Sequence, residues 1–141
     1  MAAKMTAAEM MAFLDEVFPQ VRSDYVIEHM DGQTVRMRLQ VAERHLRPGG
    51  TVSGPAMFAL ADVTAYIATM APLGLEAMAV TTSCSMDFMR KPDAGQDLIA
   101  EGRLLKLGRA LAVTDILIYS EGGSDPVARA SMTYSVPPRV G

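Results

Sequence analysis

The stretch HLRPGGTVSGPAMFALADVTAYIA, residues 45–68, passes from a glycine-rich loop into a segment with the composition of a buried helix. Ser53 is a favourable N-cap, and Pro55 suits the first helical turn because the backbone N–H that it lacks has no intrahelical partner there. Pro72 predicts that the helix ends near Ala71. Apolar residues cover nearly the whole circumference of this helix, so other structure has to surround it.

Most of the remaining chain has the pattern of β-strands, which can surround the helix. Asp31-Gly32 is a strong hairpin signal between two expected strands at residues 25–30 and 34–42. Four further strands, each bounded by turn signals, are expected at residues 77–90, 97–107, 110–121 and 126–136. The short connections between these four strands favour an antiparallel meander.

A second helix is predicted at the N-terminus. Thr6 and Glu9 have the spacing of a capping box, and Pro19 ends the helical pattern. The order of helix, hairpin, long helix and four strands predicts an α+β fold in which the long helix lies against one curved antiparallel sheet. We expect a single domain over residues 1–141, with residues 1–20 as its N-terminal helix.

The composition excludes several classes of protein. Half of the residues are hydrophobic and 21% are charged, which is typical of a globular protein and excludes general disorder. The net charge of −3 gives no general attraction to nucleic acid or to an anionic membrane, so neither is expected as a partner. No group of His, Cys, Asp and Glu has the spacing of metal ligands, so no metal ion is expected.

Three features of the sequence bear on the compartment. Cys84 is the only cysteine, which excludes an intrachain disulfide, and its alternation with Met86 predicts a small core residue. The N-terminal MAAKMTAAEMMAFLDE lacks the continuous apolar core of a secretory signal, so we expect a cytoplasmic protein. Residues 51–70 are nearly long enough to span a bilayer, but Pro55 and Asp62 interrupt them, which argues against a membrane span.

Asp62 is the single charged residue of the long predicted helix. An unpaired carboxylate in an apolar site costs on the order of a few kcal/mol, so its presence needs a reason. Three interpretations are open: Asp62 faces water at an edge of the helix, accepts hydrogen bonds as a buried structural group, or lines a ligand site. Only in the third does the carboxylate take part in chemistry.

Motifs on both sides of Asp62 resemble those of a known family. They are a glycine-containing loop, Ser53-Gly54, Leu60-Ala61-Asp62, Thr81-Thr82 and Phe88-Met89-Arg90-Lys91-Pro92. Over roughly residues 41–136 this pattern resembles the PaaI-type acyl-CoA thioesterases of the hotdog fold. The resemblance implies a long central helix wrapped by a curved antiparallel sheet. It also implies a homo-oligomer, a homodimer or a homotetramer, in which two subunits pair edge to edge and build two active sites across their interface.

The resemblance implies catalytic roles for particular residues. Asp62 matches the carboxylate that activates water or attacks the thioester carbonyl. Gly54 matches the glycine whose N–H binds the developing oxyanion, and a helix N-terminus suits this role because its first N–H groups have no intrahelical partners. Thr81 falls where related enzymes place a hydroxyl near the reacting groups. Thr82 is the alternative, because strand alternation lets only one of the two face the site.

Two positions depart from the family's pattern. Ser53-Gly54-Pro55 stands where His-Gly-Gly is usual, and Pro55 has no N–H to donate. Arg47 stands where Asn or Gln is common. Three roles are open for Arg47: it binds a carboxylated acyl group, it pairs with Asp62, or it points outward. The departures bear on catalysis more than on the fold.

We therefore expect an enzyme that hydrolyses an acyl-CoA thioester to a carboxylic acid and free coenzyme A. Its partner is the acyl-CoA substrate, and no separate cofactor is expected because coenzyme A is part of that substrate. The substrate-binding candidates are Arg47, Ser53, Pro55, Arg90 and Lys91. The two consecutive basic residues are candidates for the phosphates of coenzyme A, which favour Arg and Lys at loop edges.

Two other functions fit the same fold. An acyl-thioester dehydratase or hydratase needs an Asp/His pair, for which His45 is the nearest candidate, although a loop histidine of this kind is expected to be solvated. The second is a non-catalytic hotdog protein that only binds acyl-CoA or acts as an assembly partner, which Arg47 and Pro55 motivate. Arg103, Lys106 and Arg109 form a second candidate set for phosphate contacts, with ordinary charged turns as the alternative interpretation.

Overall fold

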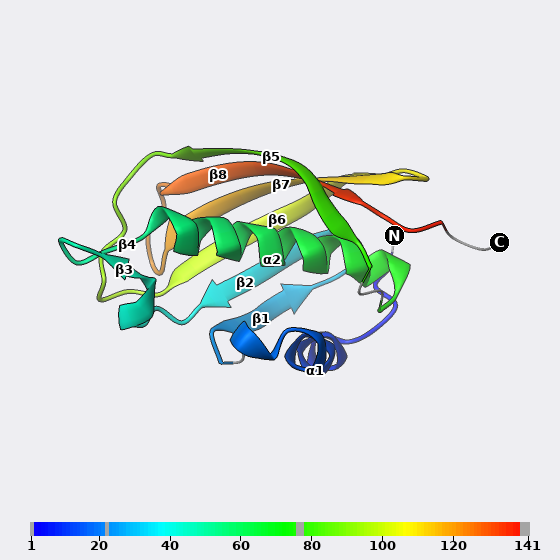
Figure 1. The fold of residues 1–141 in the computed structure, drawn as a ribbon, viewed down its shortest axis with the longest axis horizontal. Helices are drawn as coiled ribbons and strands as arrows, with labels where there is room; N and C mark the ends of the chain where they lie inside the picture. Colours follow the sequence, from blue (N-terminus) through cyan, green and yellow to red (C-terminus); the bar gives the residue numbers. More distant parts are fainter. Residues whose placement is uncertain (1, 22, 76–77, 139–141) are drawn as a thin grey trace.

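The computed structural model describes residues 2–21, 23–75 and 78–138, in which one long helix lies across the face of one antiparallel sheet (Figure 1). The helices are α1 (Ala7–Val17) and α2 (Gly54–Leu73), with short 3-10 helices at Pro19–Val21 and Glu43–His45. The strands are β1 (Tyr25–Met30), β2 (Thr34–Leu39), β3 (Leu46–Arg47), β4 (Thr51–Val52), β5 (Val80–Phe88), β6 (Leu98–Leu107), β7 (Leu111–Ser120) and β8 (Ala128–Ser135). Residue 77, where the first strand after the long helix was expected to begin, lies outside the described residues.

The large sheet has the strand order β1-β2-β6-β7-β8-β5, and every neighbouring pair is antiparallel. The predicted meander is therefore correct for β6, β7 and β8 but wrong for β5, which pairs with β8 at the edge of the sheet. The segment after β5 does not form a hairpin turn, because it runs past β4: Val52 N donates to Pro92 O over 3.0 Å, and Thr51 forms an isolated bridge with Asp93. The chain then enters β6 beside β2.

The helix caps follow the sequence signals closely. Thr6 and Glu9 form the expected capping box at the start of α1, with reciprocal bonds of 3.0 and 3.1 Å. Ser53 Oγ accepts from Ala56 N at the start of α2. The end of α2 differs, since the helix runs on through Pro72 to Leu73. A proline in the last turn removes one backbone bond, and Gly74 with φ 106° then ends the helix.

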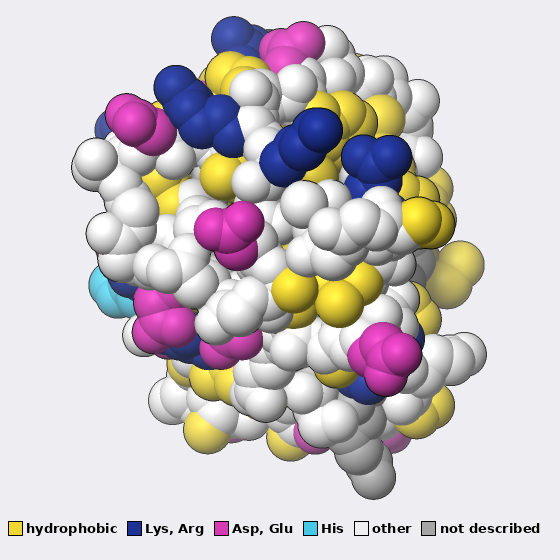
Figure 2. All heavy atoms as spheres, turned by 90° about the vertical axis from the view of Figure 1, so that its left-hand side faces the viewer, with side chains coloured by type: hydrophobic (Ala, Val, Ile, Leu, Met, Phe, Trp, Pro, Cys, Tyr) yellow, Lys and Arg dark blue, Asp and Glu magenta, His cyan; other side chains and the backbone are white. Residues whose placement is uncertain are grey.

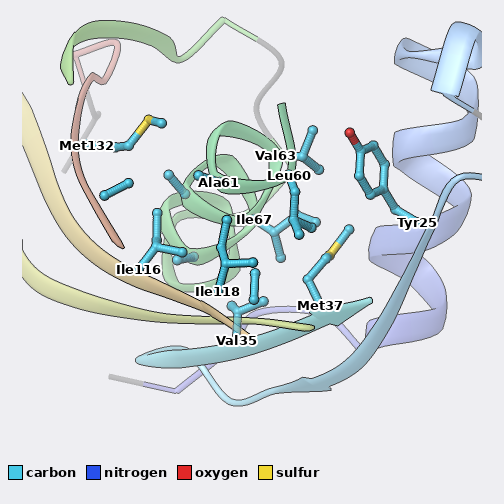
Figure 3. Close-up of a cluster of buried hydrophobic side chains, with 14 of the residues drawn as sticks. Tyr25, Val35, Met37, Leu60, Ala61, Val63, Ile67, Ile116, Ile118 and Met132 are labelled. Atoms are coloured by element: carbon cyan, nitrogen blue, oxygen red, sulfur yellow. The ribbon is translucent and has the colours of Figure 1, made fainter. Parts of the chain in front are cut away.

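Side chains of α2 and of the concave face of the sheet form the core (Figure 3). Leu60 and Ile67 of α2 contact a layer that includes Met37, Ile116 and Ile118, and all five are almost completely buried. The expectation that other structure surrounds this helix is confirmed. The helix is long and apolar enough to cross a membrane, but 67% of its apolar 18-residue stretch is buried inside the fold. Such burial is typical of a core helix that packs against a sheet.

Gly102 of β6 allows α2 to approach the sheet closely. A Cβ atom at this position would lie 2.7 Å from Cγ2 of Thr64, whose Oγ1 is tied to Leu60 O at 2.7 Å. We therefore expect Gly102→Ala to lower the free energy of unfolding by about 1–3 kcal/mol through overpacking, as measured by urea denaturation. Gly95→Ala is the matched control, because nothing lies within 4 Å of a Cβ there. Equal losses in the two variants would contradict close packing at Gly102.

Cys84 is exposed, so its prediction as a core residue is wrong. It lies on β5, where eight of the nine residues are exposed and Met86 is half-buried. The reason is the place of β5 at the edge of the sheet, where one side of the strand has no partner strand among the described residues. A nine-residue strand with an unpaired edge is long for a soluble protein, because such edges attract other strands.

Candidate active site

The carboxylate of Asp62 is half-buried in the middle of α2 and is held through one of its two oxygens. Thr81 Oγ1 donates to Asp62 Oδ1 over 2.6 Å, and the hydroxyl of Tyr134 donates to the same oxygen over 2.8 Å. The Tyr134 hydroxyl also lies 3.0 Å from the backbone carbonyl of Asp62. Among the described residues Asp62 Oδ2 accepts no hydrogen bond. One oxygen is thus fixed, while the other is available to a reactant.

Two tyrosines near Asp62 remain protonated. Burial, and then the charge of Asp62, raise the pKa of Tyr134 well above its usual range, and the same two causes raise the pKa of Tyr25 to about 12. The Tyr134 hydroxyl therefore keeps its proton near neutral pH and can donate a hydrogen bond. Its ring lies 6.1 Å, centroid to centroid, from the ring of Tyr66. Asp62 thus has an aromatic wall on one side and a hydroxyl from β5 on the other.

The structure separates the two threonine candidates. Thr81 binds Asp62, whereas Thr82 Oγ1 donates to Thr133 O on the neighbouring strand over 3.2 Å. Thr82 lies in an irregularity of the pairing between β5 and β8, where Thr81 pairs with Tyr134 and Ser83 pairs with Thr133, so the local register shift separates the two side chains as well as the expected alternation. Only Thr81 belongs to the site around Asp62.

In the described part of the chain, the amide of Gly54 at the start of α2 has no acceptor. In the first turn Ser53 Oγ accepts from Ala56 N, Ser53 O accepts from Met57 N, and Pro55 has no N–H. The Gly54 N–H is the amide that these capping contacts leave unused, and the positive end of the helix dipole lies there. The ring of Phe88 covers this position, with atoms 3.6 and 3.7 Å from where a Gly54 Cβ would be. An anionic oxygen bound here would meet an amide beside an apolar wall.

A basic cavity of ≈ 500 Å³ opens beside Gly54. Its lining includes Arg47, Gly54, Met57, Phe88, Arg90 and Lys91. Figure 2 views the end of the molecule at which α2 begins, and it shows Lys and Arg side chains gathered over the upper part of this face beside apolar ones. The cavity combines positive charge with apolar surface, which suits a ligand with phosphate groups and an apolar portion.

The predicted substrate-binding residues other than Lys91 have different positions and contacts. Arg90 Nη1 donates to Pro126 O over 2.6 Å and so anchors the segment after β5 to the turn before β8. Ser53 acts as the helix cap, and Pro55 is exposed in the first turn. Arg47 lines the basic cavity, and among the described residues it forms no ion pair with Asp62. The second basic set, Arg103, Lys106 and Arg109, lies toward the opposite end of the sheet (Figure 1).

One chain does not bring Asp62 and Gly54 together. They are eight positions apart on α2, which corresponds to about 12 Å of helix rise. A group within hydrogen-bonding distance of both would have to be far larger than one carbonyl. Asp62 instead lies beside β5, whose outer edge is unpaired, whereas Gly54 lies at the end of the helix. Within one chain, a single reacting carbonyl therefore cannot contact both groups.

The two histidines lie away from Asp62. His29 is exposed and contacts Asp31. His45 is buried, so its prediction as a solvated loop residue is wrong: its Nδ1 accepts from Ala42 N over 2.9 Å, and its Nε2 lies 3.4 Å from Asp24. Burial, and then the charge of Arg44, lower the pKa of His45. Its carbonyl accepts from Ser53 N over 2.8 Å, so His45 positions the start of α2.

A metal centre finds no support in the part of the chain that the structure describes. No group of three or more His, Cys, Asp and Glu side chains there is arranged to hold a metal ion. The carboxylate of Asp62 is instead surrounded by hydroxyl donors.

One contact of the site was missed by sequence reasoning. Tyr134 lies 72 residues after Asp62, on a strand whose alternating pattern indicates only that the residue faces inward. The available signal was its type, because a buried tyrosine usually finds a partner for its hydroxyl. Nothing local could identify Asp62 as that partner.

The fold and the site define a hotdog protein with a carboxylate on its central helix. The family model of the thioesterase superfamily matches residues 49–127, more than half of the chain. The chain belongs to the thioesterase superfamily. A search among curated proteins found no match.

Solved structures agree with this assignment. A candidate thioesterase from Silicibacter sp. TM1040 is 57% identical, with a TM-score of 0.92 over 98% of this chain and 96% of that one. The phenylacetic acid degradation protein PaaI from Thermus thermophilus, in a mutant form, is 27% identical, with a TM-score of 0.72 over 83% and 97%. A hypothetical thioesterase from Streptococcus pneumoniae TIGR4, crystallised with coenzyme A, is 24% identical, with a TM-score of 0.79 over 94% and 99%, and at this identity it shows the fold alone. The predicted hotdog fold and the PaaI-type resemblance are confirmed.

Proposed function

We propose that the protein hydrolyses an acyl-CoA thioester to a carboxylic acid and free coenzyme A, as a homo-oligomer. The observation that carries this proposal is the state of Asp62. Thr81 and Tyr134 fix one carboxylate oxygen, and the other oxygen accepts no bond among the described residues. A carboxylate held in this way can attack or deprotonate a reactant without first losing a partner.

The proposed chemistry uses the carboxylate of Asp62 and a backbone N–H group. If Asp62 acts as a base, its carboxylate takes a proton from water. The water oxygen then forms a bond to the carbonyl carbon of the thioester. The carbonyl oxygen becomes negative and is stabilised by an N–H such as that of Gly54. The carbon–sulfur bond then breaks, and the thiolate takes the proton held by Asp62 and leaves as coenzyme A, which restores the carboxylate. With Asp62 as a nucleophile, its own oxygen forms the new bond and water cleaves the resulting anhydride.

The oligomer is proposed from the distance between Asp62 and Gly54 and from the edge of β5. Two copies that pair their β5 strands would bury this exposed edge and extend the sheet. Asp62 lies next to that edge through Thr81, so an interface there brings a second copy close to it. Each site would then combine Asp62 of one subunit with Gly54 of its partner.

Coenzyme A is proposed to bind in the basic cavity. Lys91→Ala is expected to raise the Kd of coenzyme A about 3- to 10-fold by calorimetry, because a phosphate loses one cationic contact. Added salt should reduce the difference, since the group is exposed. Lys106→Ala, which removes the same charge at the far end of the sheet, is the matched control. A larger effect at Lys106 than at Lys91 would place the phosphates elsewhere.

Tyr134 is proposed to position Asp62. Tyr134→Phe removes only the hydroxyl and is expected to lower kcat about 10- to 100-fold with little change in KM, because the charged carboxylate loses a hydrogen bond. If Tyr134 acts through Asp62, then Asp62→Asn combined with Tyr134→Phe should be no slower than Asp62→Asn alone. Multiplicative losses would show instead an effect independent of Asp62. Tyr119→Phe, on β7, is the control for the loss of a tyrosine hydroxyl.

The test of the proposed function is the release of free thiol from a panel of acyl-CoAs. Hydrolysis of at least one member above the uncatalysed rate is the expected result. Thermal stabilisation by coenzyme A without thiol release would favour a non-catalytic binding protein. Consumption of an enoyl-CoA without thiol release would favour a hydratase, which the occupied histidines disfavour because His29 and His45 each contact another aspartate.

A further inference from the structure

Phe58 is an exposed aromatic side chain between the two groups that the proposed site combines. It lies four residues after Gly54 and four residues before Asp62 on α2. Residues four apart on a helix lie on the same side of it, so these three residues form one stripe. Phe58 is 37% exposed, whereas Met57 and Leu60 are buried in the core. The stripe therefore faces away from the core of its own chain.

A two-fold axis decides which residue of this stripe meets its own copy. In a symmetric dimer, if residue i of one subunit faces residue j of the other, then residue j of the first faces residue i of the second. Each proposed site combines Asp62 of one subunit with Gly54 of the other, so the two α2 helices run antiparallel past the axis. Position 58 lies midway between these two residues. Phe58 therefore faces Phe58 of the second copy.

The edge strand β5 gives a second estimate of the axis. It runs back beside α2 (Figure 1), and Thr81 near its start binds Asp62. The ring of Phe88 at its end lies 3.6 Å from the position of a Gly54 Cβ. Two β5 strands that pair antiparallel over their full length have Cys84, the middle residue, at the axis. The strand and the helix thus both place the axis midway between the carboxylate and the amide.

We propose that the ring of Phe58 packs against the same ring of a second copy on the two-fold axis, and that this contact positions both active sites. The inference rests on the proposed function and goes beyond it by naming the contact that sets the register of the two subunits. Packed helices have axes about 8–10 Å apart, and paired aromatic rings have centroids about 4.5–7 Å apart, so two rings fit between two such helices. One contact on the axis then fixes the distance between Asp62 and Gly54 of the other copy in both sites at once.

The test places opposite charges at position 58 of the full chain and follows association by analytical ultracentrifugation. Phe58→Glu and Phe58→Lys each put two like charges on the axis and are expected to weaken association at least about 100-fold relative to the wild type. Mixing the two variants should restore dimers, because each pair then holds one charge of each sign. This recovery requires position 58 to face its own copy. Circular dichroism should show that each variant is folded, since the side chain is exposed in its own chain.

The matched control uses Val26→Glu and Val26→Lys. Val26 is 36% exposed but lies on β1, at the opposite edge of the sheet from β5. Neither of these variants should change association, whether alone or mixed.

The failure of this contact and the failure of the proposed function give different results. Phe58 variants that associate like the wild type, or a mixture that stays monomeric, would overturn the contact and leave the hydrolysis of acyl-CoA intact. A wild type that dimerises, and whose charged variants behave as expected, but that releases no thiol from any acyl-CoA would overturn the proposed function and leave the contact intact. A monomeric wild type would overturn the contact together with the homo-oligomer.

Discussion

Asp62→Asn is expected to lower the kcat of acyl-CoA hydrolysis by about 10²–10⁴-fold, the range that a positioned acid–base group contributes. Asparagine keeps the shape of the side chain, and its carbonyl oxygen can still accept from Thr81 and Tyr134. It has no negative charge, so it can neither take a proton from water nor attack the thioester carbon. The loss should therefore appear in kcat while coenzyme A still binds.

The matched control is Asp115→Asn, which changes a half-buried aspartate on β7 whose neighbours in the strand face the core. It should retain wild-type rates within about twofold, as surface substitutions usually do. Thermal unfolding of both variants would show whether either fold is disturbed. Unchanged thiol release by a folded Asp62→Asn variant would remove the carboxylate from the mechanism. Incorporation of ¹⁸O from labelled water into the peptide that contains Asp62 would identify it as the nucleophile.

Local signals account for the elements that the sequence predicts well. The capping box at Thr6, the hairpin at Asp31 and the cap at Ser53 each involve side chains that bond to backbone within three residues. Such contacts depend only on residues that lie close together in the sequence, so the sequence pattern predicts them. The burial of most of α2 was also predictable, because a helix that is apolar on nearly every side has to be covered by other structure.

Strand order was harder to predict because it depends on distant partners. The strand β5 was expected to pair with the strand that follows it, yet it lies at the edge of the sheet and pairs with β8. Alternation shows which face of a strand is apolar, but it does not show which neighbour donates the backbone bonds. The error for Cys84 has the same origin, since the exposure of β5 follows from its place in the sheet.

The site shows the same division between local and distant information. Its carboxylate was identified as the one charge in an apolar helix, and Thr81 and Gly54 followed from the family resemblance. Tyr134, which contributes the second bond to Asp62, was not predicted, and His45, whose carbonyl binds Ser53 N, was expected to be a solvated loop residue. Tyr134 contacts a residue 72 positions away, and His45 contacts Ser53 across the loop between β3 and β4. A pattern along the chain carries no information about such pairs.

Gly54→Pro is expected to lower kcat about 10²–10³-fold, the loss that follows removal of one oxyanion donor. Proline is favoured at the first helical position, and Ser53, with ψ 154°, already has the extended backbone that precedes a proline. The substitution therefore removes the N–H, and thermal unfolding of the variant would show whether a proline directly before Pro55 preserves the helix start. Gly54→Ala is the matched control, because its Cβ would lie 3.6 Å from the Phe88 ring, at ordinary contact distance, and its N–H remains. Equal losses in both variants would point to a steric effect.

The same variant tests whether the site is shared between subunits. Mixing Gly54→Pro with Asp62→Asn after unfolding and refolding gives hybrid dimers in half of the cases. If each site takes Asp62 from one subunit and Gly54 from the other, every hybrid contains one intact site. The mixture should then recover about a quarter of the wild-type rate, as random pairing in a two-fold dimer predicts. If both residues acted within one chain, no hybrid would contain an intact site and the mixture would stay as slow as its components. The rise of α2 between positions 54 and 62 makes recovery the expected result.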